Sequence, residues 1–426
     1  MSAKITQLSN GAEGVFIKND RFNTTLVSYN FYMPLRAETA AHYALLPFML
    51  TTCCDKYPDF SKLNFKLSKL YGANLSASAE KVGDFQLIKI AISVIDDRFS
   101  LDGEKLSDSA IELLNQLVFE PKVKDGAFYD TDISREKRKA IEHIRGEISE
   151  KRIYARKRLI EEMYKGKPYG VSKCGTEEEV EKITGQSLYK AWREVLSHAF
   201  LRVNVISRSM PNGLFDVVSQ KLSEIDRENI TGSPVCTPTE KAKKVNTVTE
   251  NLDIAQGKLV MGFSSETYGD EESTAALSVM CDIFGGGPYS RLFSNVREKM
   301  SLCYYCSASS VKAKGLIMVD SGVEKENAET AQKEILNQLE IIKKGEFTDT
   351  EFDSSIKGMT DSLNSYNDSQ GLLDVWYSVK IFKDKLLSPE DSAELLCSVT
   401  RDDVVRAAKG VNLHTVYKLL PKECEQ

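Results

Sequence analysis

Histidine is scarce in this chain, and its scarcity limits the chemistry that the chain can perform. Only four histidines occur among the 426 residues: His42, His143, His198 and His414. The sequence contains no Gly-x-Ser-x-Gly motif, and no serine or cysteine lies in a recognisable nucleophile motif. The chain therefore offers few groups for metal-dependent or nucleophilic catalysis.

Long apolar runs and a strong charge excess are also lacking. The densest apolar run, 44–50, is short and contains a proline, whereas a membrane-spanning helix needs about 20 residues. The chain has 56 lysines and arginines and 62 aspartates and glutamates, which gives a net charge of −6. This charge does not indicate general binding of nucleic acid or anionic lipid. The first residues lack the basic start and apolar core of a secretory signal. We expect a cytoplasmic protein that binds neither nucleic acid nor membranes.

The cysteines show no disulfide or metal pattern. Of the nine cysteines, only Cys303 and Cys306 have CxxC spacing, and they stand in a segment that is typical of a strand. In a regular strand this spacing places the two thiols on opposite faces. We therefore expect reduced, structural thiols, as in other cytoplasmic proteins.

Two kinds of periodicity are present instead. Strand-like segments, many of them alternating, and segments with helical spacing both occur in each half of the chain. This pattern predicts an α+β fold, with helices packed on mostly antiparallel sheets. The expected strands are 13–18, 24–33, 73–80, 85–95 and 201–207, and the expected helices are 37–52, 61–71, 108–118, 125–164 and 177–197.

The second half of the chain repeats the first. Thr39-Ala-Ala and Thr274-Ala-Ala open similar segments, and several further matches follow in the same order at slowly drifting spacing. Residues 226–245 contain two prolines and little apolar periodicity, as linkers do. The repeat predicts two homologous domains, 1–225 and 246–426, joined by the linker 226–245.

A run of three glycines marks the second half. Gly285, Gly286 and Gly287 can adopt positive φ and can let another chain approach closely. The run lacks the GxGxxG and Gly-Lys-Ser/Thr patterns that cradle phosphates. A simple connection between two helices remains the alternative to a functional loop.

The residues after this run resemble a known family. The segment Ser290-Arg-Leu-Phe-Ser-Asn-Val-Arg-Glu-Lys-Met-Ser-Leu-Cys-Tyr304 resembles the second domain of insulinase/pitrilysin-type zinc peptidases. Pro168-Tyr-Gly170 with its following residues, and Leu70-Tyr-Gly-Ala73, are similar to first-domain segments of that family. The resemblance implies two α+β domains that form one half of a clamshell.

The metal motif of that family is degenerate here. The resemblance implies an HxxEH motif, but the aligned positions hold Ala44, Pro47 and Phe48. The later acidic pair of the family falls on Glu136 and His143. Alanine, proline and phenylalanine side chains cannot ligate zinc or accept a proton, and proline disfavours an uninterrupted helix. We expect no metal, no cofactor and no catalytic residues on this chain, and no peptide hydrolysis by the chain alone.

The substrate-binding positions of the family are retained. The resemblance implies that Arg297 and Tyr304 contact the substrate backbone, and that peptide adds to an edge strand at Ser76 and Ala77. Alternatively, Arg297 forms an ion pair on its own helix and Tyr304 packs against the fold.

The implied function is that of a non-catalytic subunit. It would bind a peptide or protein substrate, or associate with an HxxEH-containing homologue that carries the zinc, as a heterodimer or as a homodimer. Two alternatives stay open: an active zinc peptidase with an atypical site near His143 and Glu147, and a scaffold without peptide contact. Lys139 lies on the same helix face as His143 and would repel a cation there.

Overall fold

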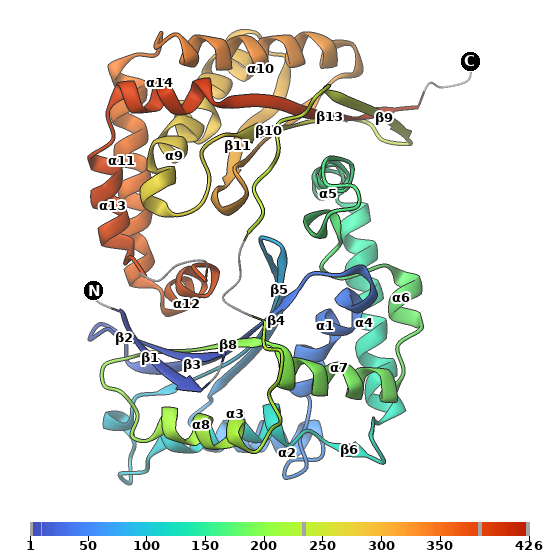
Figure 1. Cartoon of the computed structure of the whole chain (residues 1–426), viewed down its shortest axis with the longest axis vertical. Helices are drawn as coiled ribbons and strands as arrows, with labels where there is room; N and C mark the ends of the chain where they lie inside the picture. Colours follow the sequence, from blue (N-terminus) through green and yellow to red (C-terminus); the bar gives the residue numbers. More distant parts are fainter. Residues whose placement is uncertain (1–2, 10, 232–235, 382–385, 423–426) are drawn as a thin grey trace. The chain divides into compact units, whose positions relative to one another are not determined.

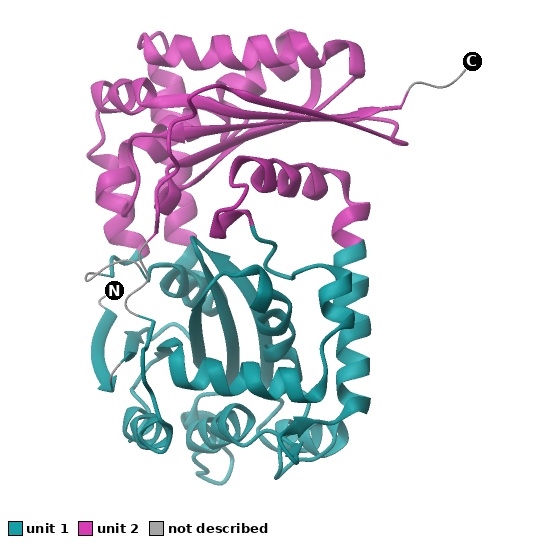
Figure 2. Ribbon diagram, turned by 45° about the vertical axis from the view of Figure 1, so that its right-hand side comes forward, with its two compact units in different colours: residues 1–145, 171–235, 366–388 teal, residues 146–170, 236–365, 389–426 magenta. Residues whose placement is uncertain are grey.

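The computed structural model describes residues 3–9, 11–231, 236–381 and 386–422. The chain divides into two compact units, which Figure 2 colours separately. Unit 1 comprises residues 1–145, 171–235 and 366–388, and unit 2 comprises residues 146–170, 236–365 and 389–426.

Unit 1 is built on a six-stranded sheet with the order β1-β2-β8-β3-β5-β4 (Figure 1). Its pairs are antiparallel except for β2 and β8, which run parallel. The strands are β1 (Ala3–Ser9), β2 (Ala12–Lys18), β3 (Thr24–Pro34), β4 (Asn74–Val82), β5 (Phe85–Ile95) and β8 (Phe200–Ser207), and a separate small hairpin joins β6 (Val123–Lys124) to β7 (Ala127–Phe128).

Unit 2 is built on a five-stranded sheet with the order β11-β12-β10-β13-β9. Again one pair, β9 with β13, is parallel and the others are antiparallel. The strands are β9 (Asn246–Leu252), β10 (Gly257–Ser265), β11 (Cys303–Val311), β12 (Leu316–Val323) and β13 (Val411–Pro421).

The two sheets have the same topology. Read from β4 and from β11, each sheet passes through three antiparallel pairs and ends in a parallel pair, and β1 is the additional strand of unit 1. A duplicated chain produces this arrangement. The mixed helix and sheet architecture with mostly antiparallel pairing confirms the predicted α+β class.

Helices cover one face of each sheet and form the core with it. In unit 1 the inward side chains of β3, such as Val27, Tyr29 and Phe31, are buried against these helices. In unit 2 the inward side chains of β10 include Met261 and Phe263. The helices of unit 1 are α1 (Ala37–Leu50), α2 (Phe60–Lys69), α3 (Leu106–Phe119), α4 (Asp130–Ser149), which runs on into unit 2, α6 (Glu177–Glu181), α7 (Gly185–His198) and α8 (Leu214–Ser223); those of unit 2 are α9 (Glu271–Gly285), α10 (Ala328–Lys343), α11 (Asp349–Ser365), α13 (Pro389–Cys397) and α14 (Arg401–Lys409).

The other face of each sheet is covered by a helix from the opposite half of the chain. Helix α5 (Lys151–Met163) belongs to unit 2 and packs on β10 and β13. Helix α12 (Gln370–Val379) belongs to unit 1 and packs on β3 and β8. The compact units therefore differ from the predicted ranges 1–225 and 246–426. The predicted linker 226–245 is divided between the units, and its residues 232–235 lie outside the described residues.

Local boundaries differ from the predictions in three places. The expected helix 125–164 is two helices, α4 and α5, separated at Glu150, and the expected helix 177–197 is α6 followed by α7. Pro47 does not interrupt α1, which continues to Leu50. Because proline has no backbone N–H, α1 lacks one hydrogen bond at this position and yet continues. At the end of the helix, the Thr51 hydroxyl donates to the Pro47 carbonyl oxygen at 3.0 Å. Among the described residues, no helix has both the length and the apolar character that crossing a membrane requires.

Candidate peptide-contact site and degenerate metal site

The aligned zinc positions on α1 hold no ligand. Pro47 is buried, Ala44 is half-buried and Phe48 is 43% exposed, and none of these side chains carries a donor atom. The nearby His42 is held elsewhere, since its Nε2 lies 3.0 Å from the Ser187 hydroxyl of α7. Burial lowers the pKa of His42, which favours its neutral form. The residues on this face of α1 do not fit a zinc ion.

The one acidic residue retained from the later motif is already neutralised. Glu136 on α4 is buried, and its carboxylate accepts hydrogen bonds from Arg135 Nε and Lys139 Nζ, each at 3.0 Å. Two cations around one buried carboxylate leave no electrostatic demand for a metal ion. The structure thus gives Glu136 a structural role.

His143, two turns further along α4, is exposed. One of its ring nitrogens lies within 4.8 Å of the Cys174 sulfur, and Glu147, one turn later on α4, is ion-paired with Lys157 at 3.4 Å. Histidine, cysteine and carboxylate are all zinc ligands in proteins. Any atypical metal site would therefore be at this end of α4, not on α1.

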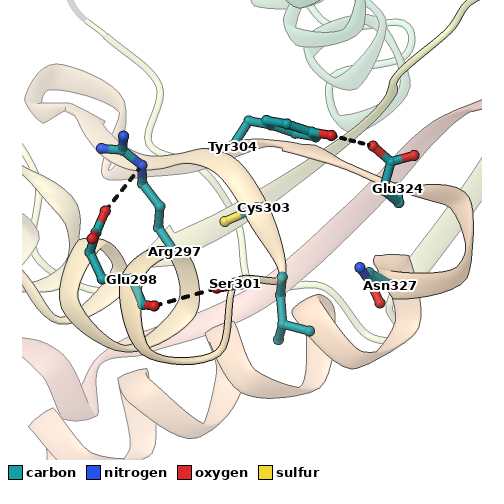
Figure 3. Close-up of a pocket in the computed structure, with 8 residues that line it drawn as sticks. Arg297, Glu298, Ser301, Cys303, Tyr304, Glu324 and Asn327 are labelled. Atoms are coloured by element: carbon teal, nitrogen blue, oxygen red, sulfur yellow. Dashed lines mark hydrogen bonds and ion pairs between the residues drawn. The ribbon is translucent and has the colours of Figure 1, made fainter.

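Arg297 and Tyr304 line one cavity of unit 2. Arg297 lies on the π-helix η3 (Leu292–Lys299), and Tyr304 lies near the start of β11. The cavity has a volume of about 400 Å³ and is shown in Figure 3. Its lining residues are Arg297, Glu298, Ser301, Leu302, Cys303, Tyr304, Glu324 and Asn327.

Both polar groups are accessible to a ligand. The Arg297 guanidinium is 4.6 Å from the centre of the Phe293 ring, its Nε is 3.5 Å from a Glu298 carboxylate oxygen, and the side chain is 40% exposed. Tyr304 is 61% exposed, and its hydroxyl donates to Glu324 at 2.8 Å (Figure 3). That hydrogen bond raises the pKa of Tyr304 and keeps the phenol protonated. A phenol and a guanidinium can both donate hydrogen bonds to a peptide carbonyl.

A β-bulge at the start of β11 shapes this site. Cys303 pairs with Val323, and Tyr305 pairs with the adjacent residue Gly322. Tyr304 is therefore an extra residue of β11 without a partner on β12. As a result Cys303 and Cys306 both face the core of unit 2, which corrects the expectation of opposite faces. Tyr304 turns outward at the bulge and becomes exposed.

The three glycines pack against the fold and do not provide left-handed backbone. None of Gly285, Gly286 and Gly287 has a positive φ, in contrast to the expectation. A Cβ at Gly285 would lie 2.6 Å from the Ala308 backbone nitrogen of β11, closer than real contacts allow. The first glycine therefore lets the end of α9 approach β11 closely.

The predicted peptide-binding strand is an edge strand. Among the described residues, β4 pairs with β5 alone, with Ser76 opposite Ala91 and Ala77 opposite Ile90. Ser76 is exposed and Ala77 is half-buried. The unpaired edge of β4 has the backbone groups that an added strand requires.

Sequence reasoning named only Arg297 and Tyr304 among the eight lining residues, and the six that it missed include Cys303, Glu324 and Asn327. The residue pattern predicts a regular strand at Cys303. A bulge that directs this side chain to the cavity leaves no mark in the pattern. Glu324 directly follows β12, and the antiparallel pairing of β11 with β12 brings it beside Tyr304. A hairpin prediction from 301 to 323 would have found Glu324.

Two features stand out: the aligned metal positions on α1 carry no ligand atoms, and Arg297 and Tyr304 line one cavity of unit 2. Comparison with known proteins agrees. Residues 182–359 match the family described as peptidase M16 inactive domain. A protein of Bacillus subtilis (strain 168), "Probable inactive metalloprotease YmfF", is 29% identical over 416 residues, which is 96% of each chain.

Solved structures show the same fold. A conserved protein from Enterococcus faecalis V583 superposes with a TM-score of 0.91 at 24% identity, over all of both chains. A peptidase M16 inactive domain from Pseudomonas fluorescens superposes with a TM-score of 0.80 at 16% identity, again over all of both chains. The chain is thus similar to the peptidase M16 inactive domain over residues 182–359, and to a probable inactive metalloprotease over 96% of its length.

Proposed function

We propose that this chain is a non-catalytic subunit that holds an extended peptide and works with a zinc-bearing homologue. The observation that carries the proposal is the contrast between two sites. The metal positions on α1 hold no donor atoms, whereas Arg297 and Tyr304 are exposed beside one cavity.

The peptide would be held through its backbone. In unit 2 the Arg297 guanidinium can donate to peptide carbonyl oxygens, and the Tyr304 hydroxyl can do so in place of its hydrogen bond to Glu324. In unit 1 the free edge of β4 can separately add a strand. Backbone recognition needs few particular side chains, so it is compatible with many peptide sequences. Hydrolysis would be supplied by the partner, in a chamber to which both chains contribute.

The test uses purified full chain, alone and mixed with an HxxEH-containing homologue encoded beside it. We expect no stoichiometric zinc and no cleavage of a fluorogenic peptide by the chain alone, and a stable complex with cleavage when the two are mixed. Arg297→Ala should reduce cleavage by the mixture about tenfold, the effect of losing one charge-assisted hydrogen bond of about 1.4 kcal/mol. Lys299→Ala is the matched control, because Lys299 is an exposed cation of the same helix that does not line the cavity.

Three outcomes would contradict the proposal. A chain that stays monomeric and has no peptide affinity would not be a peptide-holding subunit. If Arg297→Ala leaves cleavage by the mixture unchanged, the chain is a scaffold that does not contact the peptide through Arg297. Stoichiometric zinc on the isolated chain that is lost in His143→Ala would show a metal site at the end of α4.

A further inference from the structure

Two thiols meet at the wall of the cavity in unit 2. Cys303 and Cys306 are the first and fourth residues of β11, and both are buried in the same core cluster. The bulge between Cys303 and Tyr305 is responsible, because regular alternation would direct these two side chains to opposite faces. The bulge thus places both thiols of the CxxC spacing on one face of β11, where they share a hydrogen bond.

The two thiols are not equivalent. Cys303 lines the cavity, as Figure 3 shows, whereas Cys306 lies deeper and is 5% exposed. A hydrogen bond from Cys306 lowers the pKa of Cys303, burial opposes this, and the Arg297 charge adds to the lowering. The same pairing, with burial, raises the pKa of Cys306. Cys303 is thereby favoured as the attacking thiolate, and Cys306 stays protonated beside it.

A third cysteine of the same core shows what an unpaired site looks like. Cys281 on α9 is buried in this cluster, and burial raises the pKa of its thiol to about 12. Cys281 does not line the cavity. Burial alone therefore does not produce the arrangement at Cys303, which depends on the neighbouring thiol, the arginine and the cavity.

We propose that Cys303 and Cys306 form a thiol–disulfide exchange site, with Cys303 as the attacking thiol and Cys306 as the resolving thiol. Cys303 thiolate attacks one sulfur of a low-molecular-weight disulfide, whose S–S bond breaks and whose second half leaves as a thiolate. The Cys306 sulfur, after losing its proton, then attacks the Cys303 sulfur of the mixed disulfide and expels the remaining half. In total two cysteine thiols are oxidised, one disulfide is reduced to two thiols, and the two protons released by the cysteines end on those thiols.

The site is placed where the strand can yield. A disulfide needs Cα atoms within about 7 Å, so closing the bond requires the start of β11 to tighten. Among the described residues β11 is an edge strand that pairs with β12 alone, and Cys303 is its first residue. Ser301, two residues earlier, already has a left-handed φ of 51°. Movement at Cys303 would break only its terminal pairing with Val323 and would leave the rest of the sheet paired.

Tyr304 lies between the two cysteines, so bridging them would move its ring. This consequence rests on the proposed function, since Tyr304 is there a peptide contact. Oxidation would then alter peptide binding in unit 2 without any change in a metal or a partner.

The experiment treats the full-length chain with glutathione disulfide and analyses tryptic peptides by mass spectrometry. Peptide 300–312 holds both thiols and should lose two hydrogen atoms. Cys306→Ser should instead accumulate a glutathione adduct on Cys303, and Cys303→Ser should abolish both products. Cys281→Ser is the matched control for folding of the core and should leave the disulfide yield unchanged.

Exposed Cys397 serves as the internal reference for an ordinary surface thiol. Reaction of peptide 300–312 faster than Cys397 supports the exchange site. A peptide that stays reduced while Cys397 takes up glutathione overturns it, as does an equal yield of adduct in the parent chain and in Cys306→Ser. None of these readouts involves peptide binding, so a failure of the proposed function leaves them interpretable.

Discussion

The two exchanged helices cover their sheets by opposite chemistry. Helix α5 meets the sheet of unit 2 at an apolar centre, in which Ala155 and Leu159 pack against strands β10, β12 and β13. Its polar contacts include an ion pair of Arg152 with the buried Asp320 of β12 and a hydrogen bond from Tyr154 to Glu250 at 2.7 Å. A Cβ at Gly262 of β10 would lie 2.7 Å from the Met163 sulfur, so the missing side chain lets α5 approach closely.

Helix α12 instead places a carboxylate at the centre of its contact with the sheet of unit 1. Asp374 is 2.5 Å from Lys89 Nζ, and it accepts hydrogen bonds from Ser28 at 2.6 Å and Asn204 at 2.9 Å. Arg202, also buried, donates to the backbone carbonyls of Tyr377 and Lys380. Apolar packing tolerates small shifts of a helix, whereas this network is satisfied only in one position.

The largest expected effect comes from Asp374→Ala. The change leaves the Lys89 ammonium buried without its counter-charge and removes an acceptor from two further groups, which should cost about 3–5 kcal/mol of the free energy of unfolding. Urea unfolding of the full chain measures it. Val375→Ala, on the exposed face of α12, is the control and should change stability by less than about 0.5 kcal/mol.

The double variant Lys89→Met with Asp374→Leu sharpens the interpretation. Replacing both charges by apolar groups should recover part of the loss, because the pair pays a large desolvation cost. If Asp374→Ala is no more harmful than Val375→Ala, the network does not hold α12.

The apolar contact of α5 should give the next largest effect. Leu159→Ala removes a fully buried side chain at its centre and should cost about 3 kcal/mol through lost burial and the cavity left behind. The control, Ile153→Ala, truncates an exposed side chain of the same helix. Equal unfolding curves for the two variants would contradict an apolar attachment of α5.

The pH dependence of stability should separate the two attachments with the smallest effect. At the end of α12, burial lowers the pKa of Lys380 to about 7, although the Trp376 ring 3.5 Å from its Nζ favours the cation. Between pH 7 and 10.5 the unfolded chain then binds more protons than the folded chain, so stability should rise with pH. Lys380→Met should flatten this rise.

Beside α5 stability should also rise with pH, but in the acid range. Burial of Glu250 would raise its pKa, but hydrogen bonds from Tyr417 and Tyr154 outweigh burial and lower it below its usual 4.5. The stability that these bonds provide is complete above pH 4.5 and is lost as the pH falls through the lowered value. Thermal unfolding from pH 3 to 10 tests both slopes, and Glu250→Gln should remove the acid one. An acid slope that persists in Glu250→Gln would assign it to other carboxylates.

The same contrast explains what the sequence could predict. Alternation along β3 and β8 predicted the strands well, and on that basis Ser28, Asn30 and Asn204 belong to a water-facing side. They are buried instead, because α12 covers them from a position more than 160 residues further along the chain. No local pattern contains that information.

The candidate site shows a similar limit. The family resemblance pointed to Arg297 and Tyr304, and the fold places both at one cavity. The bulge that turns Tyr304 outward and Cys303 inward depends on the register of β11 against β12, which side-chain periodicity does not encode. The loss of zinc ligands, by contrast, was readable directly, because it concerns which atoms exist and not where they lie.

The exchange of helices also matters while the chain is being made. Synthesis starts at the N-terminus, so all strands of the unit 1 sheet have been made at Ser207, long before α12. Until α12 is made, the sheet face that it covers is exposed to water. Hydroxyl, amide and charged groups on that face are well hydrated during the wait, and an apolar face would instead invite aggregation. In unit 2 the order is reversed, since α5 is already present when β10 and β13 are made, and an apolar face can be covered at once. The polar groups on this face of unit 1 thus suit a nascent chain that has to remain soluble until α12 is made.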